Sequence, residues 1–248
     1  IAGRAWRVTT PDSSVTLVVS DEDAQAPTIT ASIAANQAVS VSAPRPLGEK
    51  RFEYTLSMPG GWPRGLNTLH VTATDPSGNR AEQVLWLLHA AKPADVVIID
   101  SDGNYNQNGQ KIFPLGIYEV RANDMPLIKG AGFEVVHTYR WESSQDDVAC
   151  REYLDACAAN GLRAFIGFDR GVGSGSGMVQ GNFEHLAKRV GALADHPGLF
   201  CWYLYDEPEI AKQYVSPALL TSLAELVREL DPYHPVVMTT WGRGMNKY

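Results

Sequence analysis

The second part of the chain alternates short apolar segments with segments of helix length. After Pro93, strands are expected at 115–120, 133–139, 162–168, 200–205 and 236–240, and helices at 124–129, 144–159, 183–194 and 217–230. Strands that alternate with helices in this way are typical of a parallel sheet covered by helices. Ser143 and Ser144 are expected to cap the second helix, and Asn160-Gly161 to end it. This pattern predicts an α/β domain over residues 93–248.

The number of expected strands limits what this domain can be. A closed (β/α)8 barrel of the TIM type takes about 250 residues, and the segment 93–248 is much shorter. We therefore expect about five strands of such a barrel, truncated at residue 248. An open edge between the first and fifth strands would favour self-association or a partner that completes the barrel.

Residues 1–92 have the pattern of an all-β domain. Short runs rich in β-branched residues at 15–20, 28–33, 38–42, 51–57, 68–73 and 81–88 are separated by turn sequences such as 59–63 and 75–79. This spacing predicts a small β-sandwich. The segment 65–75, followed by Gly78-Asn79-Arg80-Ala81, resembles the closing hairpin of bacterial immunoglobulin-like repeats. Residues 1–20 are either the tail of a preceding repeat or two more strands of the same sandwich.

Composition excludes several classes of function. The chain has 21 Lys and Arg against 28 Asp and Glu, a net charge of −7, so nucleic acid is not an expected partner. No apolar run approaches the roughly 18 to 20 residues of a membrane-spanning helix.

The sequence begins at Ile1 without an initiator Met or a signal segment, so it is expected to be processed or cut from a longer protein. We interpret Cys150, Cys157 and Cys201 as buried free thiols, because their spacing fits neither a disulfide framework nor a metal knuckle.

One apolar strand runs directly into carboxylates. Segment 200–205 is followed by Asp206, Glu207 and Pro208. The carboxyl ends of barrel strands face the active site, where burial or mutual repulsion can raise one carboxyl pKa, as a general acid requires. Glu207 is therefore the candidate acid. The alternative is that Asp206 and Glu207 only cap the following helix; Glu209 is interpreted as a first-turn residue of that helix.

The sequence Asp206-Glu207-Pro208 resembles the Asn-Glu-Pro signature of clan A glycoside hydrolases. Segments 107–118, 131–139 and 196–204 also resemble the approaches to the first, second and fourth strands of those barrels. The resemblance implies retaining hydrolysis of a β-linked oligo- or polysaccharide, with Glu207 as acid/base and Asp206 orienting the sugar. It implies no cofactor. The family nucleophile is a Glu at the end of the seventh strand, which would lie beyond Tyr248.

The sequence departs from this family at two positions that matter for substrate contacts. Asp206 stands where Asn is usual, and an ionised carboxylate can accept but not donate a hydrogen bond. His137 stands where the second strand usually ends in Arg; Arg140 could substitute only if its loop folds back. These departures, with the missing strands, favour an alternative function, a non-catalytic carbohydrate-binding or adhesive surface protein.

Aromatic and polar residues at the other strand ends fit a sugar-binding cleft. Aromatic faces stack on pyranose rings, and Asp, Arg and His hydrogen-bond to hydroxyls. The candidate substrate-binding residues are Tyr118, His137, Tyr139, Trp141, Asp169 and Trp241, with Arg170 beside Asp169. Plain core packing is the alternative for the aromatic residues and His137. The glycine-rich segment 171–177 lacks a phosphate-loop Lys and is interpreted as a loop on the same rim, and no ligand spacing indicates a metal. A secreted or cell-surface carbohydrate-active protein is the leading hypothesis.

Overall fold

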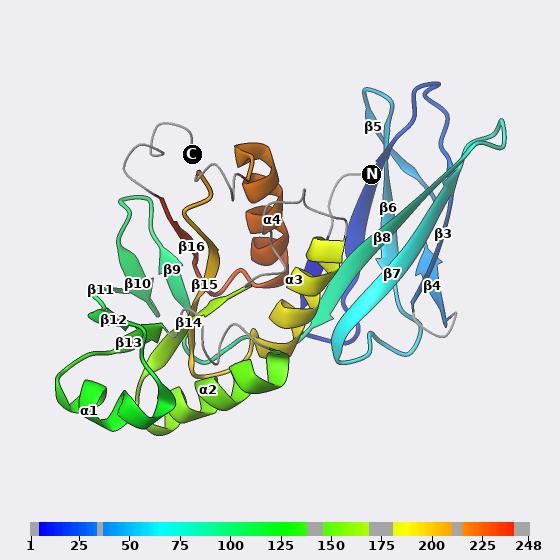
Figure 1. Cartoon of the computed structure of the whole chain (residues 1–248). Coiled ribbons are helices and arrows are strands. Elements are labelled where there is room, and N and C mark those ends of the chain that lie inside the picture. The colour runs from blue at the N-terminus through cyan, green and yellow to red at the C-terminus, as the bar shows by residue number, and fades with distance from the viewer. Residues whose placement is uncertain (1–4, 34–36, 138–145, 169–180, 210–214, 241–248) are drawn as a thin grey trace. The chain divides into compact units, whose positions relative to one another are not determined.

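The computed structural model describes residues 5–33, 37–137, 146–168, 181–209 and 215–240 (Figure 1). The chain divides into two compact units, Ile1–Ala91 and Lys92–Tyr248. No helix in the described part of the chain is long and apolar enough to cross a membrane.

The first unit is all-β, as predicted, and its strands form one continuous sheet. The strands are β1 (Ala5–Val8), β2 (Val15–Ser20), β3 (Thr28–Ile33), β4 (Gln37–Val41), β5 (Arg45–Gly48), β6 (Arg51–Ser57), β7 (Gly65–Thr74) and β8 (Arg80–His89). Their order is β1-β8-β7-β3-β4-β6-β2, with β5 on β6, and only the β1–β8 pair is parallel among the described strands. Strand β4 links the two halves of the sheet because it pairs with both β3 and β6.

The core of the first unit follows from period-two alternation along its strands. In β2, Val15, Leu17 and Val19 are buried while the residues between them are more exposed, so one face of the strand is apolar. Trp62 lies in the same core, and its indole Nε1 donates to the Ser13 carbonyl at 2.7 Å. The sheet therefore encloses one core. The immunoglobulin-like sandwich remains a prediction.

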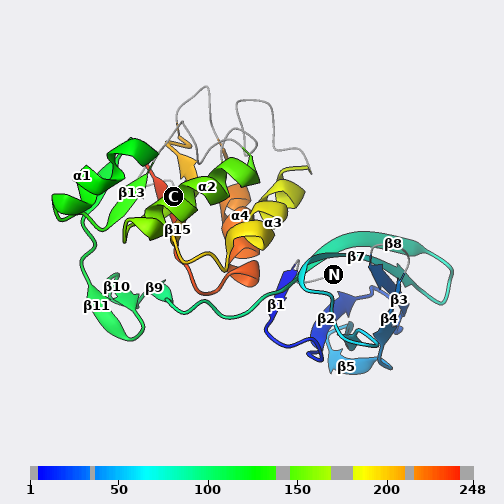
Figure 2. The same ribbon diagram turned by 90° about the horizontal axis from the view of Figure 1, so that it is seen from below.

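The second unit contains the expected parallel sheet. Its strands are β12 (Gly116–Tyr118), β13 (Val135–His137), β14 (Arg163–Gly167), β15 (Leu199–Asp206) and β16 (Val236–Thr239). They pair in chain order and all in parallel. The helical segments are η2 (Ala122–Asp124), α1 (Met125–Gly130), α2 (Asp147–Ala159), α3 (Gly181–Leu193) and α4 (Pro217–Leu230), of which α2, α3 and α4 lie side by side (Figures 1 and 2). The parallel sheet has five strands in the described residues, and the closed (β/α)8 barrel remains a prediction.

The helix boundaries follow from capping residues, with one correction to the sequence analysis. Helix α2 starts after Asp146, whose carboxylate accepts the Ala149 N–H at 2.8 Å. Asp146 is therefore the N-cap, in place of the predicted Ser143 and Ser144, which lie outside the described residues. The predicted end of α2 at Asn160 is confirmed, with Gly161 in the left-handed region at φ 65°.

A three-stranded antiparallel sheet precedes the parallel sheet and was not predicted. It consists of β9 (Val97–Ile99), β10 (Tyr105–Gln107) and β11 (Gln110–Ile112). Its apolar side chains pack against residues near the starts of the parallel strands; the cluster comprises Val97, Tyr105, Ile112, Val135, Phe165, Phe200, Cys201 and Val237. Arg163 also donates to the Gln107 side-chain oxygen at 2.9 Å. This small sheet therefore packs against residues at the amino-terminal ends of the parallel strands.

The three cysteines are free and buried, as predicted. Cys150 and Cys157 lie on the buried face of α2, and Cys201 lies in β15. Complete burial raises the pKa of the Cys201 thiol well above its usual value, because the thiolate is poorly solvated there. Cys201 is thus a packing residue.

Gly198 allows strand β15 to pass close to helix α2. A Cβ at this position would lie 2.3 Å from the Leu154 carbonyl oxygen. The Gly198 N–H donates to His196 Nδ1 at 3.0 Å, so His196 Nε2 carries the proton that it shares with Asp155 at 3.0 Å. The sequence His196-Pro197-Gly198 therefore fixes the start of the strand that carries the candidate acid.

Gly198→Ala is expected to destabilise the second unit by about 2 to 3 kcal/mol, because the added methyl group overlaps a helix carbonyl that cannot move freely. Urea unfolding followed by circular dichroism at 222 nm measures this, since every helix in the described residues belongs to the second unit. Gly130→Ala is the matched control, because nothing lies within 4 Å of its added Cβ. Equal stability of the two variants would contradict this account of Gly198.

Candidate active site

The described polar residues of the candidate site lie at the carboxyl ends of the parallel strands. Tyr118, His137, Asp206 and Thr239 are the last residues of β12, β13, β15 and β16. Tyr118 is opposite His137 in the register, and Asp206 is opposite Thr239. Because the strands are parallel, these ends meet at one edge of the sheet, where α/β proteins bind their ligands.

His137 lies at the centre of an aromatic cluster. Its side chain is buried, with the residue 6% exposed. The ring centroid is 5.2 Å from that of Tyr118, 6.1 Å from that of Phe165 and 4.7 Å from that of Tyr203. Tyr118 itself is 50% exposed. The structure therefore brings two of the predicted substrate-binding residues, Tyr118 and His137, into contact.

Burial determines the charge of His137. Desolvation lowers its pKa to about 4, although the nearby Asp206 carboxylate acts in the opposite direction. The imidazole is therefore neutral at neutral pH, and it can donate through one ring nitrogen and accept through the other. It does not supply the positive charge that an Arg at this position would.

Asp206 is held by side chains from β15 and β16. The Tyr203 hydroxyl lies 2.8 Å from Asp206 Oδ1 and 2.6 Å from Thr239 Oγ1. Asp206 is half-buried. One carboxylate oxygen of Asp206 thus has a fixed partner at the end of its own strand.

Glu207 has an unusual backbone conformation. Its φ is 48°, in the left-handed region, and its N–H donates to the Thr239 carbonyl at 3.0 Å. This conformation costs a non-glycine residue about 1 to 2 kcal/mol. The register also shifts between Tyr203 and Asp206. Backbone strain and irregular pairing next to a carboxylate are features of functional sites.

The predicted alternative for Asp206 and Glu207, capping of the following helix, is wrong for the next helix in the described residues. Helix α4 begins at Pro217 and is capped by Ser216, whose hydroxyl accepts the Leu219 N–H at 3.3 Å. Glu209 is likewise not in the first turn of α4. The two carboxylates at the end of β15 are therefore not explained by α4.

Several predicted residues lie outside the described part of the chain. These are Tyr139, Arg140, Trp141, Asp169, Arg170 and Trp241, with segment 171–177. Within the described residues, no group of three or more His, Cys, Asp or Glu side chains is placed to hold a metal ion.

Sequence reasoning missed two residues of the site, Tyr203 and Thr239. Alternation along the second half of β15 was a usable signal, because Tyr203 and Tyr205 share one parity while the buried Trp202 and Leu204 share the other. Thr239 had no such signal. Its role depends on the register between β15 and β16, which the sequence does not specify.

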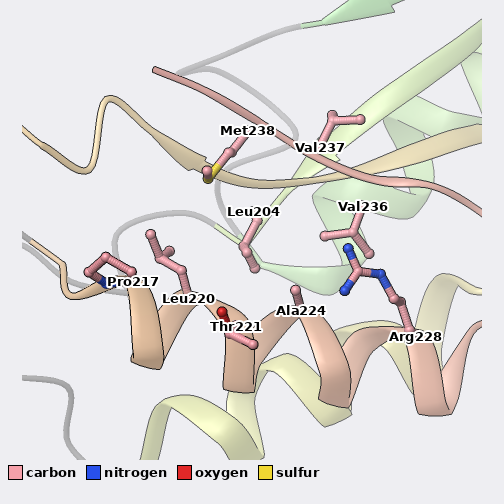
Figure 3. A pocket seen from close by; sticks show the side chains of 9 residues that line it. All are labelled: Leu204, Pro217, Leu220, Thr221, Ala224, Arg228, Val236, Val237 and Met238. Carbon is pink, nitrogen blue, oxygen red and sulfur yellow. The ribbon is translucent and has the colours of Figure 1, made fainter. Parts of the chain in front are cut away.

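A separate cavity of about 220 Å³ lies between α4 and strands β15 and β16 (Figure 3). It is lined by Leu204, Pro217, Leu220, Thr221, Ala224, Arg228, Val236, Val237 and Met238. The lining is mainly apolar and holds neither a carboxylate nor any predicted site residue. This cavity therefore does not compete with the strand ends as the candidate active site.

The buried His137 predicts a dependence of stability on pH. Its pKa is lowered in the folded protein, so the unfolded chain binds the proton more tightly and stability falls as pH decreases from about 6.5 to about 4. The loss attributable to His137 is expected to reach about 3 kcal/mol below pH 4. His137→Asn should remove this part of the pH dependence in urea unfolding at 222 nm.

His185 also contributes to the pH dependence of stability, because its pKa is lowered as well, mainly by burial. The quantity to compare is therefore the difference in pH dependence between the unaltered protein and the variant. His185→Asn is the control: it should remove only the contribution of His185 and keep that of His137. If the unaltered protein and His137→Asn lose stability in parallel from pH 6.5 to pH 4, His137 is not a buried neutral imidazole.

No protein-family model matches the chain, and no curated protein is significantly similar to it. Similar solved structures include a glycosyl hydrolase family 2 member from Bacteroides cellulosilyticus DSM 14838, at 15% identity and TM-score 0.41, covering 94% of this chain and 35% of that one. A β-glucuronidase from Ruminococcus gnavus has 11% identity and TM-score 0.43, covering 98% and 43%. A GH5 xyloglucanase from Bacteroides ovatus has 13% identity and TM-score 0.31, covering 99% and 66%. This chain spans between about a third and two thirds of the length of these proteins. All three TM-scores are below 0.5, so these likenesses assign no function to this chain.

Proposed function

We propose that this chain carries the acid/base part of the active site of a retaining glycoside hydrolase that acts on a β-linked oligo- or polysaccharide. The observation that supports this most is the backbone of Glu207. Glu207 has a strained backbone conformation at the carboxyl end of β15, and its N–H donates a hydrogen bond to the Thr239 carbonyl. The resemblance of Asp206-Glu207-Pro208 to the acid/base signature of clan A enzymes supports the same role.

In the proposed reaction, Glu207 acts twice. It first donates a proton to the glycosidic oxygen as the bond to the anomeric carbon breaks and a carboxylate nucleophile bonds to that carbon. It then removes a proton from the water that displaces the nucleophile. Retention requires the two carboxyl groups about 5 to 5.5 Å apart. By the resemblance, the nucleophile is a Glu at the end of a seventh strand, which would follow the five parallel strands described above.

The remaining strand-end residues would bind the sugar. Tyr118 is half exposed and backed by the His137 ring, which suits a platform for the apolar face of a pyranose. Neutral His137 and ionised Asp206 would hydrogen-bond to hydroxyls. A polysaccharide substrate is in keeping with a secreted or cell-surface location, which we include in the proposal.

A second candidate function is carbohydrate binding without catalysis. It is favoured by Asp206 in place of Asn and by His137 in place of Arg, since both changes remove hydrogen-bond donors from the family pattern. In this alternative the strand ends keep their sugar contacts and Glu207 transfers no proton.

The test is a survey of β-linked oligosaccharides and aryl β-glycosides, made with a protein that also contains the strand carrying the nucleophile. Hydrolysis is measured by product analysis, and binding by isothermal titration calorimetry. Hydrolysis with retained anomeric configuration supports the proposed enzyme. Binding without product after long incubation supports the second candidate. Neither hydrolysis nor binding of any member would reject both.

A further inference from the structure

The Tyr203 hydroxyl lies where the ends of β15 and β16 meet. It contacts Asp206 Oδ1 at 2.8 Å and Thr239 Oγ1 at 2.6 Å. Its ring packs against that of His137, with centroids 4.7 Å apart. The residue therefore touches the carboxylate, the neighbouring strand and the buried imidazole at one edge of the sheet.

The direction of these hydrogen bonds follows from counting protons. A phenol has one proton to donate, and an ionised carboxylate can only accept. The Tyr203 hydroxyl faces two acceptors, Asp206 Oδ1 and Thr239 Oγ1, and its single proton is shared between them. Tyr203 therefore links the Asp206 carboxylate to Thr239.

Thr239 also restrains Glu207, the residue after Asp206, through its main-chain carbonyl. Its carbonyl accepts the Glu207 N–H at 3.0 Å, so one residue of β16 restrains both consecutive carboxylates. It restrains Asp206 through the Tyr203 side chain and Glu207 through the backbone. The register shift between Tyr203 and Asp206 interrupts the regular ladder, and these bonds restrain the segment there.

We propose that Tyr203 is a positioning residue that orients the Asp206 carboxylate to receive a hydrogen bond from a substrate hydroxyl. This inference rests on the proposed function for its substrate class. Because Asp206 is acceptor-only when ionised, the site selects a sugar that presents a donor there. It disfavours one that presents a carboxylate or an acceptor carbonyl.

The first arm of the test needs no ligand. High-resolution crystal structures of the unaltered protein and of Tyr203→Phe are compared, because this change removes only the hydroxyl. The Asp206 carboxylate should occupy one orientation in the unaltered protein and several in the variant. A single unchanged orientation in Tyr203→Phe overturns the proposal, whether or not the protein is a glycosidase.

The second arm measures kcat and KM on the aryl β-glycoside that the unaltered protein hydrolyses best. Tyr203→Phe should raise KM about tenfold or more, the effect of losing a hydrogen bond to a charged group, and alter kcat less. Thr239→Val should have a similar but smaller effect, and Thr239→Ser should restore KM because it keeps the hydroxyl. An unchanged KM in both Tyr203→Phe and Thr239→Val overturns the proposal.

The two arms separate this inference from the proposed function. If the unaltered protein hydrolyses no glycoside, the proposed function fails while the structural comparison still decides the role of Tyr203. A merely structural role would reduce the folded fraction of Tyr203→Phe without changing KM or the orientation of Asp206.

Discussion

Glu207→Gln is expected to lower kcat for β-glycosides with poor leaving groups by about 10²- to 10⁴-fold, the usual contribution of a general acid. Glutamine keeps the shape of the side chain but has no acidic proton to give to the glycosidic oxygen. Formation of the glycosyl-enzyme from a 2,4-dinitrophenyl glycoside should change little, because that leaving group departs without protonation. Rates on the two substrate classes, measured with the same protein preparation, provide the comparison.

Azide makes this test specific for the acid/base role. Azide attacks a glycosyl-enzyme without needing a base, so it should accelerate turnover of activated substrates by Glu207→Gln and yield a β-glycosyl azide. The matched control is Glu209→Gln, which removes a carboxylate two residues later and should keep turnover. If Glu207→Gln hydrolyses poor leaving groups as fast as the unaltered protein, Glu207 is not the acid.

The parallel sheet could be predicted because its elements carry their own signals. Helix α4 occupies the predicted range 217–230, with Pro217 in its first turn. Helix α2 ends at the predicted Asn160-Gly161 stop. Apolar strands between such helices leave few alternatives to a parallel sheet.

The sheet β9–β11 was missed although one signal was present. Asn108-Gly109 is a strong two-residue hairpin sequence, and both residues have positive φ, 50° and 88°. The flanking strands have three residues each, too few for alternation to identify them. The capping of the parallel strands by this sheet depends on tertiary packing.

The sequence predicts the two carboxylates of the candidate site but not the contacts that hold them in place. A strand that ends in Asp206 and Glu207 is visible in the sequence. Strict alternation would place Asp206 on the side of Trp202 and Leu204, and the register shift after Tyr203 breaks this alternation. The Tyr203 and Thr239 contacts follow from that irregularity, for which the sequence has no local signal.

A buried polar network connects β15 to the end of α4, and we expect its loss to destabilise the second unit strongly. Asp231, the C-cap of α4, is fully buried at 0% exposure. Its Oδ2 accepts from Trp202 Nε1 at 2.8 Å and from His234 Nδ1 at 2.8 Å, and its Oδ1 accepts the Tyr233 N–H at 3.1 Å. As the carboxylate accepts, His234 carries its proton on Nδ1. One side chain thus joins the end of α4, the start of β16 and the strand of the candidate acid.

Asp231→Ala is expected to lower the free energy of unfolding of the second unit by about 3 to 5 kcal/mol, because it leaves two buried donors, Trp202 and His234, and one part-buried N–H without their acceptor. Asp231→Asn should lose less, since its amide oxygen can still accept from Trp202. Urea unfolding at 222 nm measures both. Asp195→Ala is the control, because Asp195 is exposed, and it should change stability by no more than about 0.5 kcal/mol. If Asp231→Ala is as stable as this control, the network does not hold β15 to α4. The position of Asp206 and Glu207 would then depend on the strand pairing and on the contacts of Tyr203 and Thr239.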